Sequence, residues 1–161
     1  MIITETLEET YIPQLWAIDR AIWNPSNTPA LAQYENYEHY AKSLRHQKLL
    51  IAIDEENDQV LGAVSYHHPS PLPAHQRQWV LGIGIAPSAQ GQGVGRALMK
   101  HLIDLAPSDN IGKISLRVFA TNPGARHFYQ QLGFQDEGFL QKEYWLNNQW
   151  VDEYAMAYYV N

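Results

Sequence analysis

One stretch of the sequence, Trp79–Met99, constrains the fold more than any other, because it joins an apolar run, a glycine-rich turn and an amphipathic segment. Residues 79–86 form the apolar run, which predicts a strand that Pro87 stops. From Val94 to Leu105 the apolar residues recur at helical spacing and mark one face of a helix. A helix N-terminus carries unpaired N–H groups and a partial positive charge, and glycines let a phosphate approach the backbone closely. The stretch therefore predicts an anion-binding loop between a strand and a helix.

The loop does not fit either of the common nucleotide-binding patterns. A Walker loop places Lys and then Ser or Thr after its glycines, and neither follows here. A dinucleotide fingerprint needs Gly-x-Gly-x-x-Gly, whereas Gly91, Gly93 and Gly95 alternate along the chain. Gly82 and Gly84 lie inside the predicted strand. Both nucleotide-binding hypotheses are therefore weak.

The spacing instead resembles the pyrophosphate loop of the GNAT superfamily of acetyl-CoA-dependent N-acetyltransferases. Gln90-Gly91-Gln92-Gly93-Val94-Gly95 fits that family's Gln/Arg-x-x-Gly-x-Gly/Ala pattern. The block Asn122–Phe134 is similar to the family's Asn-x-x-Ala-x-x-Phe-Tyr-x-x-x-Gly-Phe at every defined position. The tail up to Met156 looks like that of members that acetylate amino acids, protein N-termini or small amines. The resemblance covers the chain from about Val60 onward.

The resemblance implies a role for each matching residue. Tyr129 would act as the general acid that protonates the departing CoA thiolate, and a phenol with a pKa of ~10 is protonated at pH 7. Asn122 is a good N-cap as well, and the resemblance adds a hydrogen bond toward the pantetheine arm or the acceptor. The predicted cofactor-binding residues are Ile83, Gly84, Ile85, Gln90, Gly91, Gln92, Gly93, Val94, Gly95, Arg96, Asn122, Ala125 and Tyr129.

The resemblance also places a β-bulge in the strand of residues 79–86, which turns one backbone N–H toward the thioester carbonyl. Gly82 and Gly84 are consistent with a bulge, because glycine inside a strand often marks one. The splayed strands 79–86 and 114–119 would then form the slot for the pantetheine arm.

The sequence departs from the family pattern at the general base. Many members carry a glutamate early in this strand, but no carboxylate stands near Trp79 or Leu81. An amine that arrives neutral would need no base at all. The candidates for a general base are His67, His68, His75 and Glu143. Each of them can also be explained as an ordinary surface or loop residue.

Elsewhere the pattern of apolar residues predicts the remaining elements. The predicted strands are residues 2–6, 49–53, 60–66, 79–86, 114–119 and two within 134–159, around a turn at Asn147-Asn148. The predicted helices are residues 8–22, 34–44 and 94–105, and one that Asn122-Pro123 opens and Gly133 ends. Four aromatic residues are predicted to cover a core edge rather than to line an acceptor pocket: Trp23, Tyr34, Trp145 and Trp150.

These elements predict an α/β (α+β) fold in the order β-α-α-β-β-β-α-β-α-β-β. We expect a single GNAT-type domain over residues 1–161, with a mixed, mostly antiparallel sheet of six or seven strands and about four helices.

Composition narrows the partners. The net charge of −6 disfavours nucleic acid and favours a cationic acceptor. The absence of cysteine excludes disulfides and a cysteine nucleophile, and it suits a cytoplasmic location. The seven histidines form no metal-ligand pattern, and no signal peptide or membrane-spanning run is present.

Together these features predict an N-acetyltransferase that moves the acetyl group of acetyl-CoA directly to a primary amine or a peptide N-terminus. We expect no metal, no membrane and no nucleic acid, and a homodimer formed through an edge strand or the terminal hairpin. A non-catalytic acyl-CoA-binding or sensor module on the same fold is the alternative. The acceptor stays open among free amino acids, peptide N-termini, polyamines and antibiotic amines.

Overall fold

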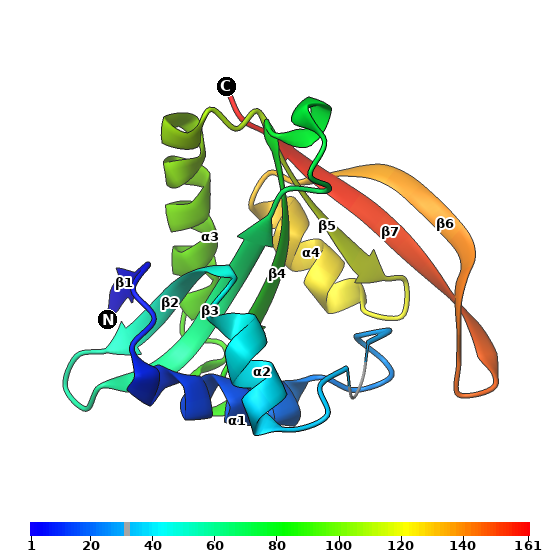
Figure 1. Cartoon of the computed structure of the whole chain (residues 1–161). Helices are drawn as coiled ribbons and strands as arrows, with labels where there is room; N and C mark the ends of the chain where they lie inside the picture. Colours follow the sequence, from blue (N-terminus) through cyan, green and yellow to red (C-terminus); the bar gives the residue numbers. More distant parts are fainter. Residues whose placement is uncertain (31–32) are drawn as a thin grey trace. The chain divides into compact units, whose positions relative to one another are not determined.

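The computed structural model describes residues 1–30 and 33–161. Within them it contains four α-helices and seven strands, in the order predicted (Figure 1). The bounds are β1 Ile2–Thr4, α1 Ile12–Ile22, α2 Tyr37–Leu44, β2 Lys48–Asp54, β3 Gln59–His67, β4 Gln78–Ile85, α3 Val94–Leu105, β5 Lys113–Phe119, α4 Pro123–Gln131, β6 Gln135–Leu146 and β7 Gln149–Tyr159. The strand order is β1-β2-β3-β4-β5-β7-β6. β4 and β5 run parallel, whereas β1–β2, β2–β3, β5–β7 and β6–β7 run antiparallel, which confirms the mixed, mostly antiparallel sheet.

The chain divides into two compact units, and β4 contributes to both. The first unit holds β1, β2, β3, α1 and α2, together with the β4 residues from Leu81 onward and α3. The second unit holds a loop that begins at Trp23, residues His68–Val80 and residues Ala106–Asn161. The single domain expected over residues 1–161 stays a prediction.

The first unit is built around β2. Every residue of β2 from Leu49 to Ile53 is buried, as expected for a strand that is covered on both faces. α1 and α3 both pack on β3, and α3 also contacts β2. α3 buries Leu98, Met99 and Leu102, so the helical spacing read from the sequence gives the correct inward face.

Two helices begin later than the sequence indicates. A 3-10 turn over Glu9–Tyr11 comes before α1, so Pro13 falls in the first α-helical turn, where proline is tolerated. α2 begins at Tyr37 rather than Tyr34, because the Asn36 side chain accepts a hydrogen bond from the His39 N–H at 2.9 Å and caps the helix. The capping residue therefore fixes the start of α2, and the apolar pattern alone does not reveal it.

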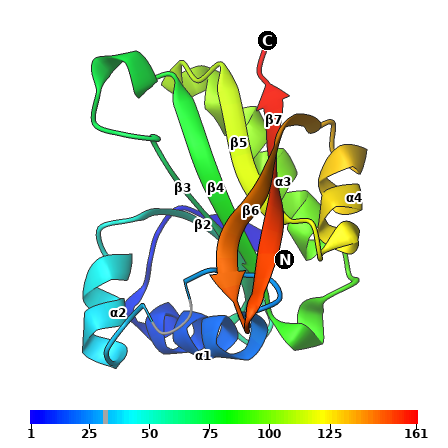
Figure 2. The same cartoon turned by 90° about the vertical axis from the view of Figure 1, so that its right-hand side faces the viewer.

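The second unit is a sheet of β5, β7 and β6 with the first residues of β4 at its edge and α4 packed on β5 (Figure 2). β6 and β7 form the expected hairpin. Asn147 and Asn148 both have positive φ, 51° and 58°, as a two-residue type I′ turn requires. The sequence thus predicts this hairpin and its turn correctly.

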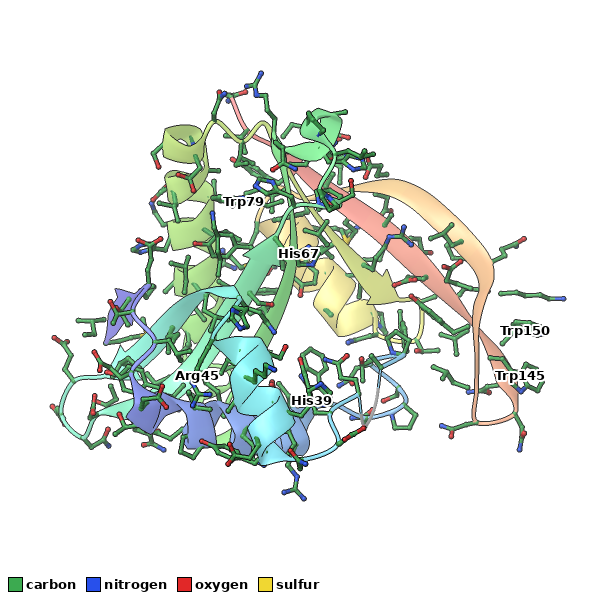
Figure 3. All side chains as sticks on the ribbon, in the orientation of Figure 1. His39, Arg45, His67, Trp79, Trp145 and Trp150 are labelled. Atoms are coloured by element: carbon green, nitrogen blue, oxygen red, sulfur yellow. The ribbon has the colours of Figure 1, made fainter. Side chains whose placement is uncertain are left out.

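The prediction for the hairpin tryptophans is wrong. Trp145 and Trp150 are 57% and 52% exposed and contact each other across the hairpin, with ring centroids 5.1 Å apart (Figure 3). β7 pairs with β5 only as far as Glu153, so the tip of the hairpin extends beyond that pairing. Tyr34 does cover an edge, because its ring packs edge-on against Tyr40 of α2.

β3 approaches β4 unusually closely at Gly62. A Cβ built on Gly62 would lie 2.8 Å from the Gly84 carbonyl oxygen and 2.7 Å from the Ile85 Cδ1. Beside this contact, just after the end of β4, the Ala86 N–H donates to the carbonyl of Leu61, the residue before Gly62, at 2.9 Å. Only glycine fits at position 62, because any side chain would have to displace backbone atoms of β4.

We predict that Gly62→Ala destabilises the protein by ~1–3 kcal/mol, the usual cost of overpacking, measured by urea unfolding. Gly138→Ala on β6 is the matched control, since the nearest atom to its new Cβ lies 3.9 Å away. Equal free energies of unfolding for the two variants would show that the close approach at Gly62 has no energetic weight.

Candidate functional site

The carboxyl-terminal end of β4 is more exposed to solvent than expected for a strand in the middle of the strand order. Gly82 is exposed, and Ile83, Gly84 and Ile85 are partly exposed. Ser65 of β3 faces Gly82, with its hydroxyl 3.4 Å from the Gly82 carbonyl oxygen. The hydrogen bond from the Ala86 N–H to the Leu61 carbonyl lies four residues after Gly82 on β4 and four residues before Ser65 on β3. The expected β-bulge stays a prediction.

The glycine-rich loop follows β4 and is held by its own glutamines. The Gln90 side-chain amide donates to the Ile85 carbonyl at 3.2 Å, and that of Gln92 donates to the Ser88 carbonyl at 3.0 Å. Gly91 and Gly93 have φ values of 75° and 83°, in the left-handed region that disfavours other residues. The two glutamine side chains thus have a structural role here, and the two glycines allow the turn.

The loop ends at the N-terminus of α3. The first helical hydrogen bond joins the Ala97 N–H to the Gly93 carbonyl at 3.0 Å. The N–H groups of Val94, Gly95 and Arg96 therefore come before the first helical donor and remain available to a ligand. No acidic residue lies in the first turn of α3, so no carboxylate offsets the positive end of the helix dipole. This arrangement favours an anion such as a phosphate.

α4 in the second unit has the expected start and end. The Asn122 side chain accepts from the Ala125 N–H at 3.2 Å, and Pro123 occupies the first helical position. Gly133 follows the helix with a φ of 97°, and its N–H donates to the Gln130 carbonyl at 3.0 Å. The capping role of Asn122 is confirmed, and a contact with the pantetheine arm stays a prediction.

Tyr129 lies on α4 in an aromatic cluster. Its ring centroid is 5.3 Å from that of Phe128 and 5.9 Å from that of Phe134, which in turn contacts Tyr158 of β7. Burial in these apolar surroundings raises the pKa of the Tyr129 phenol to about 12. The phenol is therefore protonated throughout the neutral range, as a general acid must be.

The predicted cofactor-binding residues fall into two groups. Residues 83–85 and 90–96 belong to the first unit, at the end of β4, in the loop and at the start of α3. Asn122, Ala125 and Tyr129 share the first two turns of α4 in the second unit. The slot expected between strands 79–86 and 114–119 stays a prediction.

The four candidate bases differ in what surrounds them. The His68 Nδ1 lies 2.9 Å from the Gln78 carbonyl oxygen, and the His75 Nδ1 lies 2.7 Å from the Ser70 hydroxyl. His67 is exposed at the end of β3 (Figure 3). Glu143 is exposed on β6. None of the four is fully buried, because His68 and His75 are half-buried and the other two are exposed.

A further residue, the carboxylate Glu153 of β7, was not among the four sequence candidates. Among the described residues it is the one charged residue that is buried, at 2% exposure. Burial raises the pKa of its carboxyl group, while Tyr144 and Arg117 act in the opposite direction. The sequence does hold a signal: Asp152 and Glu153 are adjacent in a strand, so one of the two carboxylates must point to the inner face.

The described residues contain no group of three or more His, Asp or Glu side chains that could hold a metal ion. None of the helices in residues 1–30 and 33–161 is both long enough and apolar enough to cross a bilayer.

Comparison with known proteins gives a consistent match. Residues 12–134 match the Acetyltransferase (GNAT) family. The chain is 34% identical over 130 residues to a mycothiol acetyltransferase from Renibacterium salmoninarum, which covers 72% of this chain and 37% of that protein. It is 39% identical over 69 residues to a spermidine N(1)-acetyltransferase from Vibrio cholerae, or 42% of this chain and 40% of that protein. The chain thus spans well under half the length of either relative.

The fold is also that of solved structures. The crystal structure of smu.2055 from Streptococcus mutans superposes with a TM-score of 0.89 at 26% identity, and the match covers 100% of both chains.

We predict that Gly93→Ala destabilises the protein by about 1–2 kcal/mol through its left-handed backbone alone, because a Cβ at this position meets no atom within 4 Å. Gly112→Ala is the matched control, since it has the same open surroundings without a positive φ. Urea unfolding measures both variants, and a Gly93→Ala protein as stable as the control would contradict the conformation assigned to the loop.

Proposed function

Since the chain belongs to the acetyltransferase (GNAT) family, we propose that it transfers the acetyl group of acetyl-CoA directly to the nitrogen of a primary amine. The observation that carries the proposal is the start of α3, where the N–H groups of residues 94–96 come before Ala97, the first helical donor. The loop Gln90–Gly95 would hold the cofactor's pyrophosphate there. Family members use acetyl-CoA as the acetyl donor, and this anion-binding geometry supports the same donor here.

The remaining residues have complementary roles in the proposed reaction. Ile83, Gly84 and Ile85, the partly exposed end of β4, would contact the pantetheine arm and the thioester carbonyl. Asn122 and Ala125 at the start of α4 are also proposed to contact the arm. The amine nitrogen attacks the acetyl carbonyl carbon, the carbon–sulfur bond breaks, and Tyr129 donates its proton to the leaving thiolate. Positioning of the two substrates supplies much of the rate.

The acceptor is proposed to be a cationic amine at neutral pH. The net charge of −6 favours the approach of such a molecule. One relative is named for mycothiol and another for spermidine, so the printed names cover more than one acceptor. The class proposed here is therefore the primary amine, which includes polyamines and peptide N-termini.

The assay that tests this function measures thiol release from acetyl-CoA with a panel of amines. The panel contains spermidine, a peptide with a free N-terminus, free amino acids and an aminoglycoside. Acetylation of at least one amine, identified by mass spectrometry, is the expected result. Binding of CoA without turnover on any member of the panel would identify a non-catalytic acyl-CoA-binding module instead.

Three further features of the protein stay predictions: a cytoplasmic location, no binding to nucleic acid, and a homodimer formed through an edge strand or the terminal hairpin. Sedimentation at micromolar concentration, with and without a DNA or RNA duplex, measures the last two.

We predict that Tyr129→Phe lowers kcat on the order of 10²-fold or more and leaves the KM for acetyl-CoA nearly unchanged, because only the proton donor is removed. The pKa of about 12 places the loss of the phenol proton beyond the assay range, so Tyr129 should add no alkaline limb to the kcat profile below pH ~11.

Tyr159→Phe removes a phenol that is 53% exposed at the end of β7 and serves as the control. If Tyr129→Phe and Tyr159→Phe both keep the wild-type kcat at every pH, Tyr129 is not the general acid.

A further inference from the structure

Glu153 combines deep burial with incomplete pairing. Its Oε2 is buried and makes no hydrogen bond to any residue that the structure describes. The nearest cation is the Arg117 guanidinium, with Nη1 3.6 Å from that oxygen, and the Arg117 side chain is 52% exposed. A half-exposed partner beyond hydrogen-bond distance does not compensate a carboxylate for the loss of its water. The Glu153–Arg117 ion pair would therefore contribute little to stability if its role were purely structural.

The backbone beside Glu153 is irregular. Leu140 of β6 pairs with Glu153, but the next pair is Tyr144 with Val151, so β6 contains two more residues than β7 between the same two pairs. Lys142 lies in this bulge with a φ of 51°, and its N–H donates to the Asp152 carboxylate at 2.8 Å. Bulges and residues in the left-handed region occur preferentially at functional sites, where they redirect a side chain.

The bulge changes which side chain accompanies Glu153. In an unbroken register, Lys142 would pair with Val151, whereas the bulge gives this position to Tyr144. The Tyr144 phenol then acts on the Glu153 carboxylate and favours its charged form. The Tyr144 ring also packs on Phe119, the β5 residue opposite Glu153, at 5.5 Å between centroids. The result is a carboxylate with one aromatic wall and one oxygen, Oε2, that accepts no hydrogen bond from the described residues.

This cluster faces away from α4. Successive residues of a strand point to opposite faces, and the ring of Tyr154, next to Glu153, lies under the Arg126 guanidinium of α4 at 3.9 Å. Tyr129 belongs to the α4 face, through Phe134 and Tyr158. Glu153 and Tyr129 therefore lie on opposite faces of the sheet formed by β5, β7 and β6.

We propose that Glu153 is the general base, which takes a proton from the acceptor's ammonium group directly or through one water molecule. The inference rests on the proposed acetyltransferase function. The ammonium N–H bond breaks and its proton goes to a Glu153 carboxylate oxygen, which leaves a neutral amine. The amine lone pair forms the bond to the acetyl carbon, and the carbon–sulfur pair leaves on the thiolate. Tyr129 protonates the thiolate, the second N–H proton returns to the Tyr129 phenolate through solvent, and Glu153 releases its proton to water.

The charged groups around Glu153 set its proton affinity. Arg117 of β5 and Tyr144 of β6 stabilise the carboxylate, whereas burial and the nearby Glu143 of β6 destabilise it, and burial is the largest of these influences. The net effect raises the pKa of the Glu153 carboxyl group above the ordinary value for glutamate. A base with a raised pKa takes a proton from an ammonium group more readily.

The test uses the full chain, acetyl-CoA and the best acceptor of the amine panel. Glu153→Gln keeps the shape of the side chain and removes the base. We expect kcat/KM for the acceptor to fall on the order of 10²–10⁴-fold, and the acid limb of its pH profile to disappear. The KM for acetyl-CoA should stay near that of the wild type. Glu153→Asp should restore part of the rate together with the acid limb.

A thermal measurement separates this role from a structural one. Because the folded-state pKa of Glu153 is raised, its ionisation costs stability as pH rises through that pKa, and the cost is absent below the ordinary glutamate pKa. Glu153→Gln should therefore unfold at an equal or higher temperature than the wild type at pH 8. Glu137→Gln is the control; it removes the β6 carboxylate that pairs with Lys113 and should leave the acid limb in place.

Each outcome has one meaning. A wild-type rate with an unchanged acid limb in Glu153→Gln would overturn the base assignment and leave the acetyltransferase function standing. A variant with a lower melting temperature, a normal acid limb and a rate lowered in proportion to its folded fraction would make Glu153 structural. A wild-type protein without transfer to any amine would overturn the function and the base assignment together.

Discussion

The close approach of β3 to the end of β4 is the contact on which the rest of the candidate cofactor site depends. Gly62 lets the two backbones meet at Gly84 and Ile85, and the hydrogen bond from Ala86 to Leu61 fixes the point where the chain leaves the strand. The loop then folds back onto the same strand, because the Gln90 amide binds the Ile85 carbonyl. Contacts with β4, rather than solvent-exposed contacts, thus fix the orientation of the loop and of the start of α3.

Much of this could be predicted from the sequence, because the signals are local. The helical spacing after the loop, the Asn122-Pro123 start and the Asn147-Asn148 turn each encode a conformation within a few residues, and each has the predicted structure. The start of α2 and the exposure of Trp145 and Trp150 could not be predicted in the same way. They depend on which residue caps a helix and on where the partner strand of a hairpin ends.

Glu153 is the clearest case of a residue whose role could not be predicted from the sequence. Alternation in β7 shows that either Asp152 or Glu153 faces inward, but the choice depends on the register with β5. The bulge in β6, which brings Tyr144 to this carboxylate, has no local signature such as a glycine, since Lys142 takes the left-handed conformation itself. The sequence places four base candidates on loops and exposed positions, and a buried strand carboxylate emerges only when the strands are assembled.

A single physical cause, the loss of water around an ionisable group, acts on both proposed proton-transfer residues and suits each to a different task. Burial raises the pKa of Tyr129, which keeps the phenol protonated and able to donate. Burial also raises the pKa of Glu153, which strengthens the carboxylate as an acceptor of protons. A phenol with a pKa of about 12 is a weak acid toward a thiolate in water, but a sulfur atom in equally apolar surroundings also has a raised pKa, so the two stay closer than their values in water suggest. Glu153 and Tyr129 lie on opposite faces of the sheet, so the proton taken from the amine has no direct path to the thiolate. The order of the two proton transfers therefore depends on the substrate that each residue contacts: the amine for Glu153 and the thiolate for Tyr129.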